Sequence, residues 1–357
     1  MNSRERTFLA LEHKPGDRIP IDCWASRSLI KKLEEAFGCS YEHFLDRHDV
    51  DLRYISGPEY MGPPLGAGRD IWGVERVTVH VGDKGRRESY SELAVSPLAS
   101  ARNVDDIRNY PHYPSPDWFD YRAIERQCDE IRNKGRVVVF MGDRLNRVAQ
   151  LKPAMYLRGA ENIFTDLALH EDMARVLFEK IRDFYQTYVK RILEAARGKI
   201  DIVLTGDDFG AQNGLLMSPE MWRQFIRPGF AEYVALIKEY GAKAMHHTCG
   251  SVLEIIPDLI DCGLDILQSL QPEACGMALA DLKAKYGSRL CFHGGVSIQR
   301  TLPFGSPAEV RREVKRIADL FRHDGGYIFC TSHNIQADTP LANVESLFHA
   351  YHEHGRI

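Results

Sequence analysis

Two side chains that bind soft or borderline metal ions stand one residue apart at the end of an apolar run. They are His247 and Cys249, in the stretch 242–249. In an extended backbone, residues i and i+2 point to the same side, so this imidazole and this thiolate can converge on one ion. Gly250 then allows a sharp turn into the next helical pattern. The structural alternative is a small buried cysteine beside a hydrogen-bonded histidine.

An alternation of strand and helix patterns predicts how this pair is positioned. Eight alternating β and α units favour a closed (β/α)8 barrel, a TIM barrel, over an open doubly wound sheet. Barrels often reach this length as one unit, so we expect a single domain over 1–357. The expected strands cover 19–24, 50–55, 136–142, 200–208, 242–249, 264–268, 289–295 and 327–331.

Residues 58–117 interrupt the alternation. Within them, 77–81 and 88–90 flank the glycine-containing stretch 82–85 in the pattern of a β-hairpin. We expect this hairpin, inserted between strands two and three, to be an excursion from the barrel.

Polar and ionisable side chains gather at the predicted C-terminal ends of the strands. Barrels of this type carry their catalytic groups there, and a barrel end that served stability alone would not need so many of them. The residues are Asp22, Trp24, Tyr54, Asp143, Arg144, Asp207, Asp208, His247, Cys249, Gln268, His293, Cys330 and His333.

Several of these residues have a structural alternative. Asp207 and Asp208 either cap the next turn or contact a substrate. His293 is as well explained as a satisfied buried histidine, and Trp24 as cavity wall.

Composition and charge exclude some classes of function. The formal net charge of −4 gives no basic surface for nucleic acid or an anionic membrane. The sequence contains no apolar run of the roughly 18 residues that a spanning helix needs, and no signal-peptide core. The eight cysteines are scattered, as in a reduced cytosolic protein. We therefore expect a cytoplasmic protein that acts on a small-molecule substrate.

Four stretches carry a family resemblance. They read DDFGAQ at 207–212, HTCG at 247–250, FHGGV at 292–296 and SHNIQADTP at 332–340. Together they resemble the uroporphyrinogen decarboxylase superfamily over nearly the whole chain. That family has a (β/α)8 barrel, in agreement with the strand pattern.

One branch of that superfamily, the decarboxylases, binds a tetrapyrrole with many carboxylates and uses no metal. Its N-terminal Arg-x-Pro-Val-Trp stretch is followed by further arginines. Here Arg18 and Pro20 match, but the acidic Asp22 follows where an anionic substrate favours cations. The resemblance therefore disfavours uroporphyrinogen as the substrate. A metal-free decarboxylase or lyase for a small carboxylated substrate remains the alternative.

The other branch passes a methyl group between a corrinoid and a thiol or related acceptor, with zinc on His-x-Cys-Gly and a later cysteine. His247 and Cys249 match the first two ligands. The third position, counted back from Pro340, falls on His333 and not on Cys330, although spacing alone leaves both open. The resemblance implies Zn²⁺ as cofactor and a corrinoid carried by a partner protein. A homodimer is a further open alternative.

These observations assign expected roles. Zinc-dependent methyl transfer between a corrinoid and a small-molecule acceptor or methylated donor is the expected function. The expected catalytic residues are Asp207 and His293, the substrate contacts are Trp24, Tyr54, Asp208 and Gln268, and the metal ligands are His247, Cys249 and His333.

Overall fold

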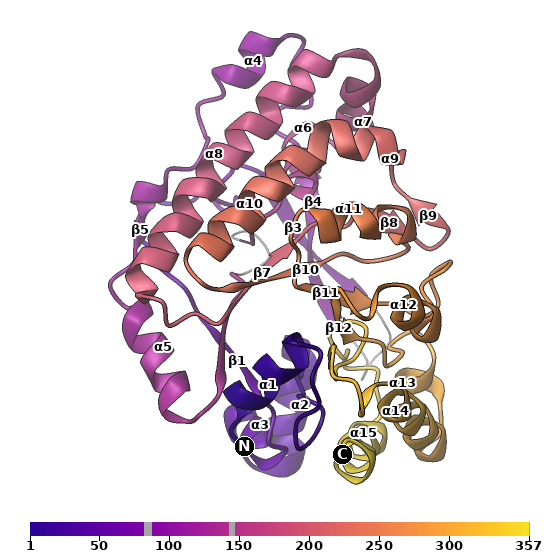
Figure 1. Ribbon diagram of the computed structural model, residues 1–357. Helices are drawn as coiled ribbons and strands as arrows, with labels where there is room; N and C mark the ends of the chain where they lie inside the picture. The colour runs from indigo at the N-terminus through magenta and orange to yellow at the C-terminus, as the bar shows by residue number, and fades with distance from the viewer. Residues whose placement is uncertain (82–87, 143–146, 357) are drawn as a thin grey trace.

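Seven parallel strands form one curled sheet at the centre of the computed structural model, which describes residues 1–81, 88–142 and 147–356 (Figure 1). The strands lie side by side in chain order. They are β1 (Leu52–Ile55), β6 (Val137–Phe140), β7 (Ile202–Gly206), β10 (Lys243–His247), β11 (Ile266–Leu270), β12 (Cys291–Gly294) and β13 (Tyr327–Ile328). These correspond to the second to eighth predicted strands.

The side chains of the strands belong to two buried clusters, one inside the curled sheet and one under the helices. Alternate strand residues form a separate buried cluster that includes Val139, Leu204 and Met245. The residues between them, such as Val138 and Val203, join the larger cluster that packs under the helices. Both sides of each strand are therefore buried, as expected of parallel strands covered by helices.

The predicted first strand, 19–24, is not a regular strand. Ile21 forms an isolated parallel bridge with Phe329, just after β13. Phe329 N donates to Pro20 O at 2.7 Å, and Asp51 N donates to Ile21 O at 2.9 Å just before β1. The segment thus hydrogen-bonds to both ends of the seven-stranded sheet. Pro20 has no N–H to give, which prevents a regular ladder.

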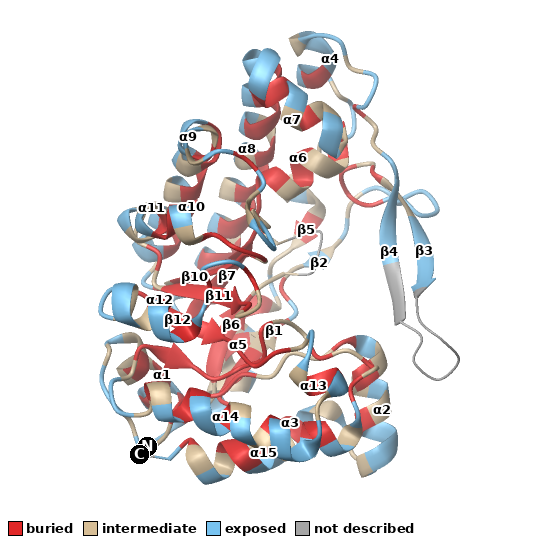
Figure 2. Cartoon of the chain, turned by 90° about the vertical axis from the view of Figure 1, so that its right-hand side faces the viewer, coloured by how far each residue is buried: buried red, intermediate tan, exposed pale blue. Residues whose placement is uncertain are grey.

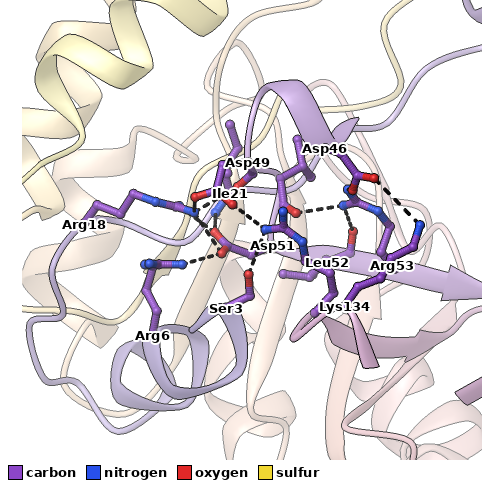
Figure 3. Close-up of polar contacts among 12 residues, drawn as sticks. Ser3, Arg6, Arg18, Ile21, Asp46, Asp49, Asp51, Leu52, Arg53 and Lys134 are labelled. Atoms are coloured by element: carbon purple, nitrogen blue, oxygen red, sulfur yellow. Dashed lines mark hydrogen bonds and ion pairs between the residues drawn. The ribbon is translucent and has the colours of Figure 1, made fainter. Parts of the chain in front are cut away.

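Asp51 holds this segment at the N-terminal end of β1 (Figure 3). Its Oδ1 accepts from Arg6 Nη1 at 2.6 Å, and its Oδ2 accepts from Arg18 Nη1 at 2.6 Å and from Ile21 N at 2.8 Å. The Asp51 side chain is fully buried, so its charge needs these partners. Arg18 is therefore used in a structural network at the end of the strands opposite His247.

Helices cover the outside of the sheet, with buried inner and exposed outer faces (Figure 2). Among the described residues, no helix is both long and apolar enough to cross a membrane. The α-helices are α1 (Ser3–Leu11), α2 (Arg27–Phe37), α3 (Tyr41–Arg47), α4 (Val104–Arg108), α5 (Ile124–Asn133), α6 (Leu151–Arg158), α7 (Ala160–Leu169), α8 (Glu171–Ala196), α9 (Pro219–Met221), α10 (Arg227–Glu239), α11 (Ile256–Asp261), α12 (Leu279–Tyr286), α13 (Thr301–Phe304), α14 (Pro307–Phe321) and α15 (Leu341–His354).

A wide turn at Trp222–Ile226 precedes α10 and has π-helical hydrogen bonding. The helical pattern from Ser218 to Tyr240 predicts one interruption, at Pro228, and the irregular turn lies just upstream of that residue. Pro228 cannot donate a backbone hydrogen bond to the preceding turn, which disfavours continuous α-helix there.

An antiparallel ribbon lies between β1 and β6 in the chain. It consists of β3 (Glu75–Val81) and β4 (Glu88–Val95), and it projects from the sheet and its helices (Figure 2). The turn expected at 82–85 lies outside the described residues, as do Asp143 and Arg144. Two smaller antiparallel pairs join β2 (Glu59–Tyr60) to β5 (Phe119–Asp120) and β8 (Gly210–Ala211) to β9 (Gly214–Leu215).

Candidate metal centre and adjoining cavity

Three side chains able to bind a metal ion meet at the C-terminal edge of the sheet. His247 ends β10, Cys249 follows it, and His333 comes from the loop after β13. Each offers one ligand atom, and these atoms lie within 4.8 Å of one another. Two imidazoles and a thiol form a donor set that suits Zn²⁺. The structure thus groups His333, and not Cys330, with the His247–Cys249 pair.

Neighbouring amides hold the two imidazoles. Nδ1 of His247 hydrogen-bonds to Oε1 of Gln268, and its Nε2 lies 3.4 Å from Sγ of Cys249. Nδ1 of His333 contacts Asn334 through the side-chain oxygen and through the backbone N, the latter at 2.8 Å. Metal-binding histidines are typically oriented in this way through their second ring nitrogen.

Burial sets the protonation of the three groups. It lowers the pKa of His333, and it lowers the pKa of His247 well below its usual value, with the charge of Arg147 acting in the same direction. Burial and then the Asp208 charge raise the pKa of the Cys249 thiol to about 12. Neutral imidazoles are ready to bind a cation, and a thiolate here needs the charge of one. The residues therefore fit a zinc ion.

A carboxylate stands beside the three ligand candidates. Oδ1 of Asp208 lies 3.6 Å from Nε2 of His247 and accepts from Cys249 N at 3.0 Å. Its Oδ2 lies 2.6 Å from Nζ of Lys152. Burial alone would raise the pKa of Asp208, but the charge of Lys152 and the Cys249 N–H hold that pKa below its usual range. Lys152 was not singled out from the sequence because no motif marks it and its partner is 56 residues away.

Asp207, the neighbouring carboxylate, has a different set of contacts. Its two oxygens accept from the backbone N of Gln150, Leu151 and Lys152 at 2.6, 2.7 and 2.6 Å, where α6 begins. Burial raises the pKa of Asp207 to about 6, and those three N–H groups act in the opposite direction. Both oxygens are thus used to cap α6. Of the two predicted aspartates, it is Asp208 that faces the ligand candidates.

Trp24 begins a line of hydrogen-bonded, partly buried side chains next to the centre. Its ring stacks on His247, with centroids 5.8 Å and planes 23° apart. Trp24 Nε1 donates to Tyr54 Oη at 2.6 Å, and Tyr54 donates to Asp22 Oδ2 at 2.5 Å. Nε2 of His293 lies 2.9 Å from the same Asp22 oxygen. The predicted substrate contacts Trp24 and Tyr54 are therefore linked to His293, which was expected to be catalytic.

Cys330 belongs to a second group of ligand atoms, deeper in the fold. Asp22, His293 and Cys330 offer atoms within 4.8 Å of one another, and all three residues are buried. Asp22 and His293 already contact each other, and Cys330 hydrogen-bonds weakly to Thr331. This position agrees with the interpretation of Cys330 as a core residue.

The backbone of β11 is irregular at Ser269, next to the centre. Ser269 has φ +77° at a register shift between Gln268 and Leu270, and its hydroxyl donates to Ser332 O at 2.7 Å. That hydroxyl also lies 3.8 Å from Sγ of Cys249. A bulge of this kind is a common way to turn side chains toward a site, and apolar periodicity gives no sign of it.

A small cavity with about 30 Å³ of water-accessible space is lined in part by Lys152, next to the centre. Asp70, Trp72, Val74 and Arg76, which come from the 58–117 excursion, contribute to its lining, as do Arg147 and Lys152. Lys152 connects the cavity to the centre through its ion pair with Asp208. Arg147 does so through Trp24, whose ring centroid lies 5.7 Å from the Arg147 Cζ. Sequence reasoning did not assign these cavity residues.

Comparison with known proteins identifies the family. A family model described as uroporphyrinogen decarboxylase (URO-D) matches residues 95–354, which is well over half of the chain. The chain belongs to this family. A solved structure described as a methyltransferase from Methanosarcina mazei aligns with this URO-D member over 99% of both chains, with a TM-score of 0.68 and 19% identity, and so shows the same fold.

The relatives that match this URO-D member over its full length are methyltransferases. "Methylcobamide:CoM methyltransferase MtaA" of Methanosarcina barkeri is 28% identical over 98% of both chains, and "Methylcobamide:CoM methyltransferase MtbA" of M. mazei is 21% identical over 96% of both. The uroporphyrinogen decarboxylase of Actinobacillus succinogenes is 31% identical over only 22% of each chain. The predicted closer resemblance to the methyltransferase-like branch is confirmed.

Proposed function

We propose that this URO-D family member is a zinc-dependent methyltransferase, which passes a methyl group between a corrinoid carried by a partner protein and a small molecule. The observation that carries the proposal is the convergence of ligand atoms from His247, Cys249 and His333 within 4.8 Å. Full-length similarity to two methylcobamide:CoM methyltransferases supports the same reaction class.

The proposed zinc site consists of His247, Cys249 and His333. When bound there, Zn²⁺ lowers the pKa of a thiol or hydroxyl group toward neutrality and so supplies a nucleophile. With a thiol acceptor, an ion held by His247, Cys249 and His333 would favour release of the thiol proton to solvent. The sulfur would then take the methyl group from the corrinoid of the partner protein, which would keep the electron pair of the broken bond.

The surrounding residues orient and shield this chemistry. Trp24 covers one face of His247 and keeps water from it. Gln268 fixes the ring of His247, and Asp208, held ionised beside Lys152, places a negative charge 3.6 Å from its Nε2. That charge offsets part of the charge of a divalent ion in a site where burial makes electrostatic interactions strong.

Metal analysis and a methyl-transfer assay test the proposal together. Protein purified without a His tag is expected to hold one zinc per chain and to demethylate methylcobalamin, followed by its absorbance, with a panel of thiols. Methoxy compounds test the reverse direction with the cobalt(I) form. Metal-loaded protein that shows no transfer in either direction would contradict the proposal.

A metal-free decarboxylase is the second candidate. Arg147 and Lys152 support it, because cations beside the centre suit a carboxylated substrate. If the protein releases carbon dioxide from a carboxylated substrate at the same rate before and after zinc removal, this function would be selected over methyl transfer.

A further inference from the structure

The ribbon of β3 and β4 carries an unusual share of the exposed apolar side chains. Of the ten large apolar side chains that are exposed in the described residues, four lie on it, and no other described element carries more than one. They are Val77, Val79, Leu93 and Val95. All residues of 77–80 and 91–95 are exposed, so neither face of this part of the ribbon packs on the rest of the chain. Two strands alone are marginally stable in water, so such a ribbon gains stability from a further strand.

The second edge of β3 is covered only at its start. Residues 68–69 lie beside β3 on the side away from β4, where Arg76 N donates to Gly68 O at 2.7 Å. Alternate residues of a strand direct their N–H and C=O groups to the same edge, so Thr78 directs its backbone groups to this edge as well. In the described residues, β4 is the only strand that pairs with 77–81. An open edge of this kind is a template for another strand.

The sequence of this open edge is symmetric. Residues 77–81 read Val-Thr-Val-His-Val. If the same stretch of a second copy lies antiparallel with Val79 on the two-fold axis, valine stands opposite valine at each odd position and Thr78 stands opposite His80. Thr78 then forms backbone hydrogen bonds across the axis, and Val79 stands opposite its counterpart in a pair without them. Opposed β-branched residues stabilise a sheet.

Charge distinguishes this edge from the outer edge of β4. Residues 88–92 read Glu-Ser-Tyr-Ser-Glu, which is also symmetric. A two-fold axis at the middle of that stretch would place position 88 opposite position 92 of the second copy, and so glutamate opposite glutamate. Like charges directly opposite each other destabilise an antiparallel pair. Within 77–81 no two like charges would meet, so charge favours a two-fold contact through β3.

We propose that two copies of this chain associate through residues 77–81 of β3 and form a four-stranded antiparallel sheet in the order β4–β3–β3–β4. The ribbon projects from the central sheet and its helices (Figure 2), which gives a second ribbon access to this edge. The same surface is used on both copies, so the assembly closes at two. This inference is independent of the proposed function, because 77–81 contains none of the proposed metal ligands or substrate contacts.

Sedimentation of the full chain measures the association. The interface is small, so the 40.7 kDa monomer is expected to give way to a dimer over protein concentrations of about 1–200 µM. Val79→Lys should raise the dissociation constant at least about tenfold, because two ammonium groups would meet at the axis. Val95→Lys is the matched control, since Val95 is exposed on β4 of the same ribbon, and it should associate like the wild type. Circular dichroism checks that both variants are folded.

Cross-linking measures the register. In a Cys275→Ser background, which removes an exposed native thiol, Val79→Cys should form a disulfide between two chains on oxidation by copper phenanthroline. Opposed residues of a pair without hydrogen bonds have Cα atoms about 4.5 Å apart, which a disulfide can bridge. Val77→Cys in the same background is the control. In the proposed register its two copies lie four residues apart along the strands, roughly 13 Å, which a disulfide cannot bridge.

Three outcomes would overturn the proposal. A chain that stays monomeric at every concentration would leave the ribbon to a different protein. Association that Val79→Lys and Val95→Lys weaken equally would show general apolar contact in place of strand pairing. Cross-linking through position 77 that equals or exceeds cross-linking through position 79 would exclude the two-fold axis at Val79.

Discussion

The carboxylate of Asp208 faces the imidazole of His247, with Oδ1 3.6 Å from Nε2, whereas Asp207 caps α6 through three backbone N–H groups. Asp208→Asn is therefore expected to lower zinc affinity and methyl transfer by about 10–100-fold, as loss of a group that supports a metal ligand does. Zinc titration and initial rates measure both effects.

Asp207→Asn is the matched comparison for that prediction. An amide cannot accept all three N–H groups as well, so we expect a loss of about 1 kcal/mol in the free energy of unfolding, measured by urea, with zinc still bound. If Asp207→Asn abolished turnover at full stability and Asp208→Asn did not, Asp207 would be the functional carboxylate.

His333→Ala is expected to cut zinc affinity steeply, because it removes one of three proposed ligands. Cys330→Ala should keep one zinc per chain, since Cys330 lies with Asp22 and His293 in the buried second group. Elemental analysis after dialysis against a weak chelator measures the stoichiometry. A zinc-free Cys330 variant beside a zinc-loaded His333 variant would place the ion on the second group.

Tyr54→Phe removes the hydroxyl that joins Trp24 to Asp22. Both partners lose a partly buried hydrogen bond, so the variant is expected to lose about 1–3 kcal/mol of unfolding free energy. Tyr113→Phe, which removes one hydrogen bond of 2.9 Å to Ile107 O, should cost less. Urea unfolding compares the two variants, and equal losses would show that the two hydrogen bonds of Tyr54 add nothing beyond a single hydrogen bond.

His48 gives the fold an acid-sensitive point far from the centre. It stacks on Phe348, with ring centroids 4.2 Å apart, and burial together with His352 and other nearby positive groups lowers its pKa to about 4. The unfolded chain, with a histidine pKa near 6.5, binds more protons between those values. The stabilising contribution is thus complete above about pH 6.5 and is lost as the pH falls toward 4.

His48→Phe should reduce the loss of unfolding free energy at low pH. The part of the pH dependence that comes from His352 and the carboxylates should remain. His43→Gln, at an exposed histidine of α3, serves as control and should keep the wild-type slope. Urea midpoints at pH 7.5 and 5.0 measure the effect. A wild-type urea midpoint that is no lower at pH 5.0 than at pH 7.5 would contradict the role of His48.

Periodicity predicted seven of the strands because their apolar runs are continuous and buried on both sides. It failed at 19–24, where Pro20 breaks the ladder and the chain relies on Asp51 instead of regular pairing. Periodicity also predicted the interruption of the 218–240 helix at Pro228, whereas the irregular turn, Trp222–Ile226, lies before that residue.

The grouping of His247, Cys249 and His333 could be predicted because short motifs and strand ends mark all three. The place of Lys152 could not be predicted, because it depends on a contact with Asp208, 56 residues away in the chain. The different uses of Asp207 and Asp208 were equally hidden. Neighbouring residues at a strand end point in different directions, and only the position of α6 decides which one becomes a cap.

The irregular segment beside β13 has a consequence for the order of events during synthesis. Ile19 N donates to Gly355 O, and Phe329 N donates to Pro20 O, so residues from the start of the chain wait for partners made more than 300 residues later. At about 5–20 residues per second, that delay is on the order of tens of seconds. Until Phe329 is made, Ile21 lacks its bridge partner, so this edge of the sheet is completed only near the end of synthesis.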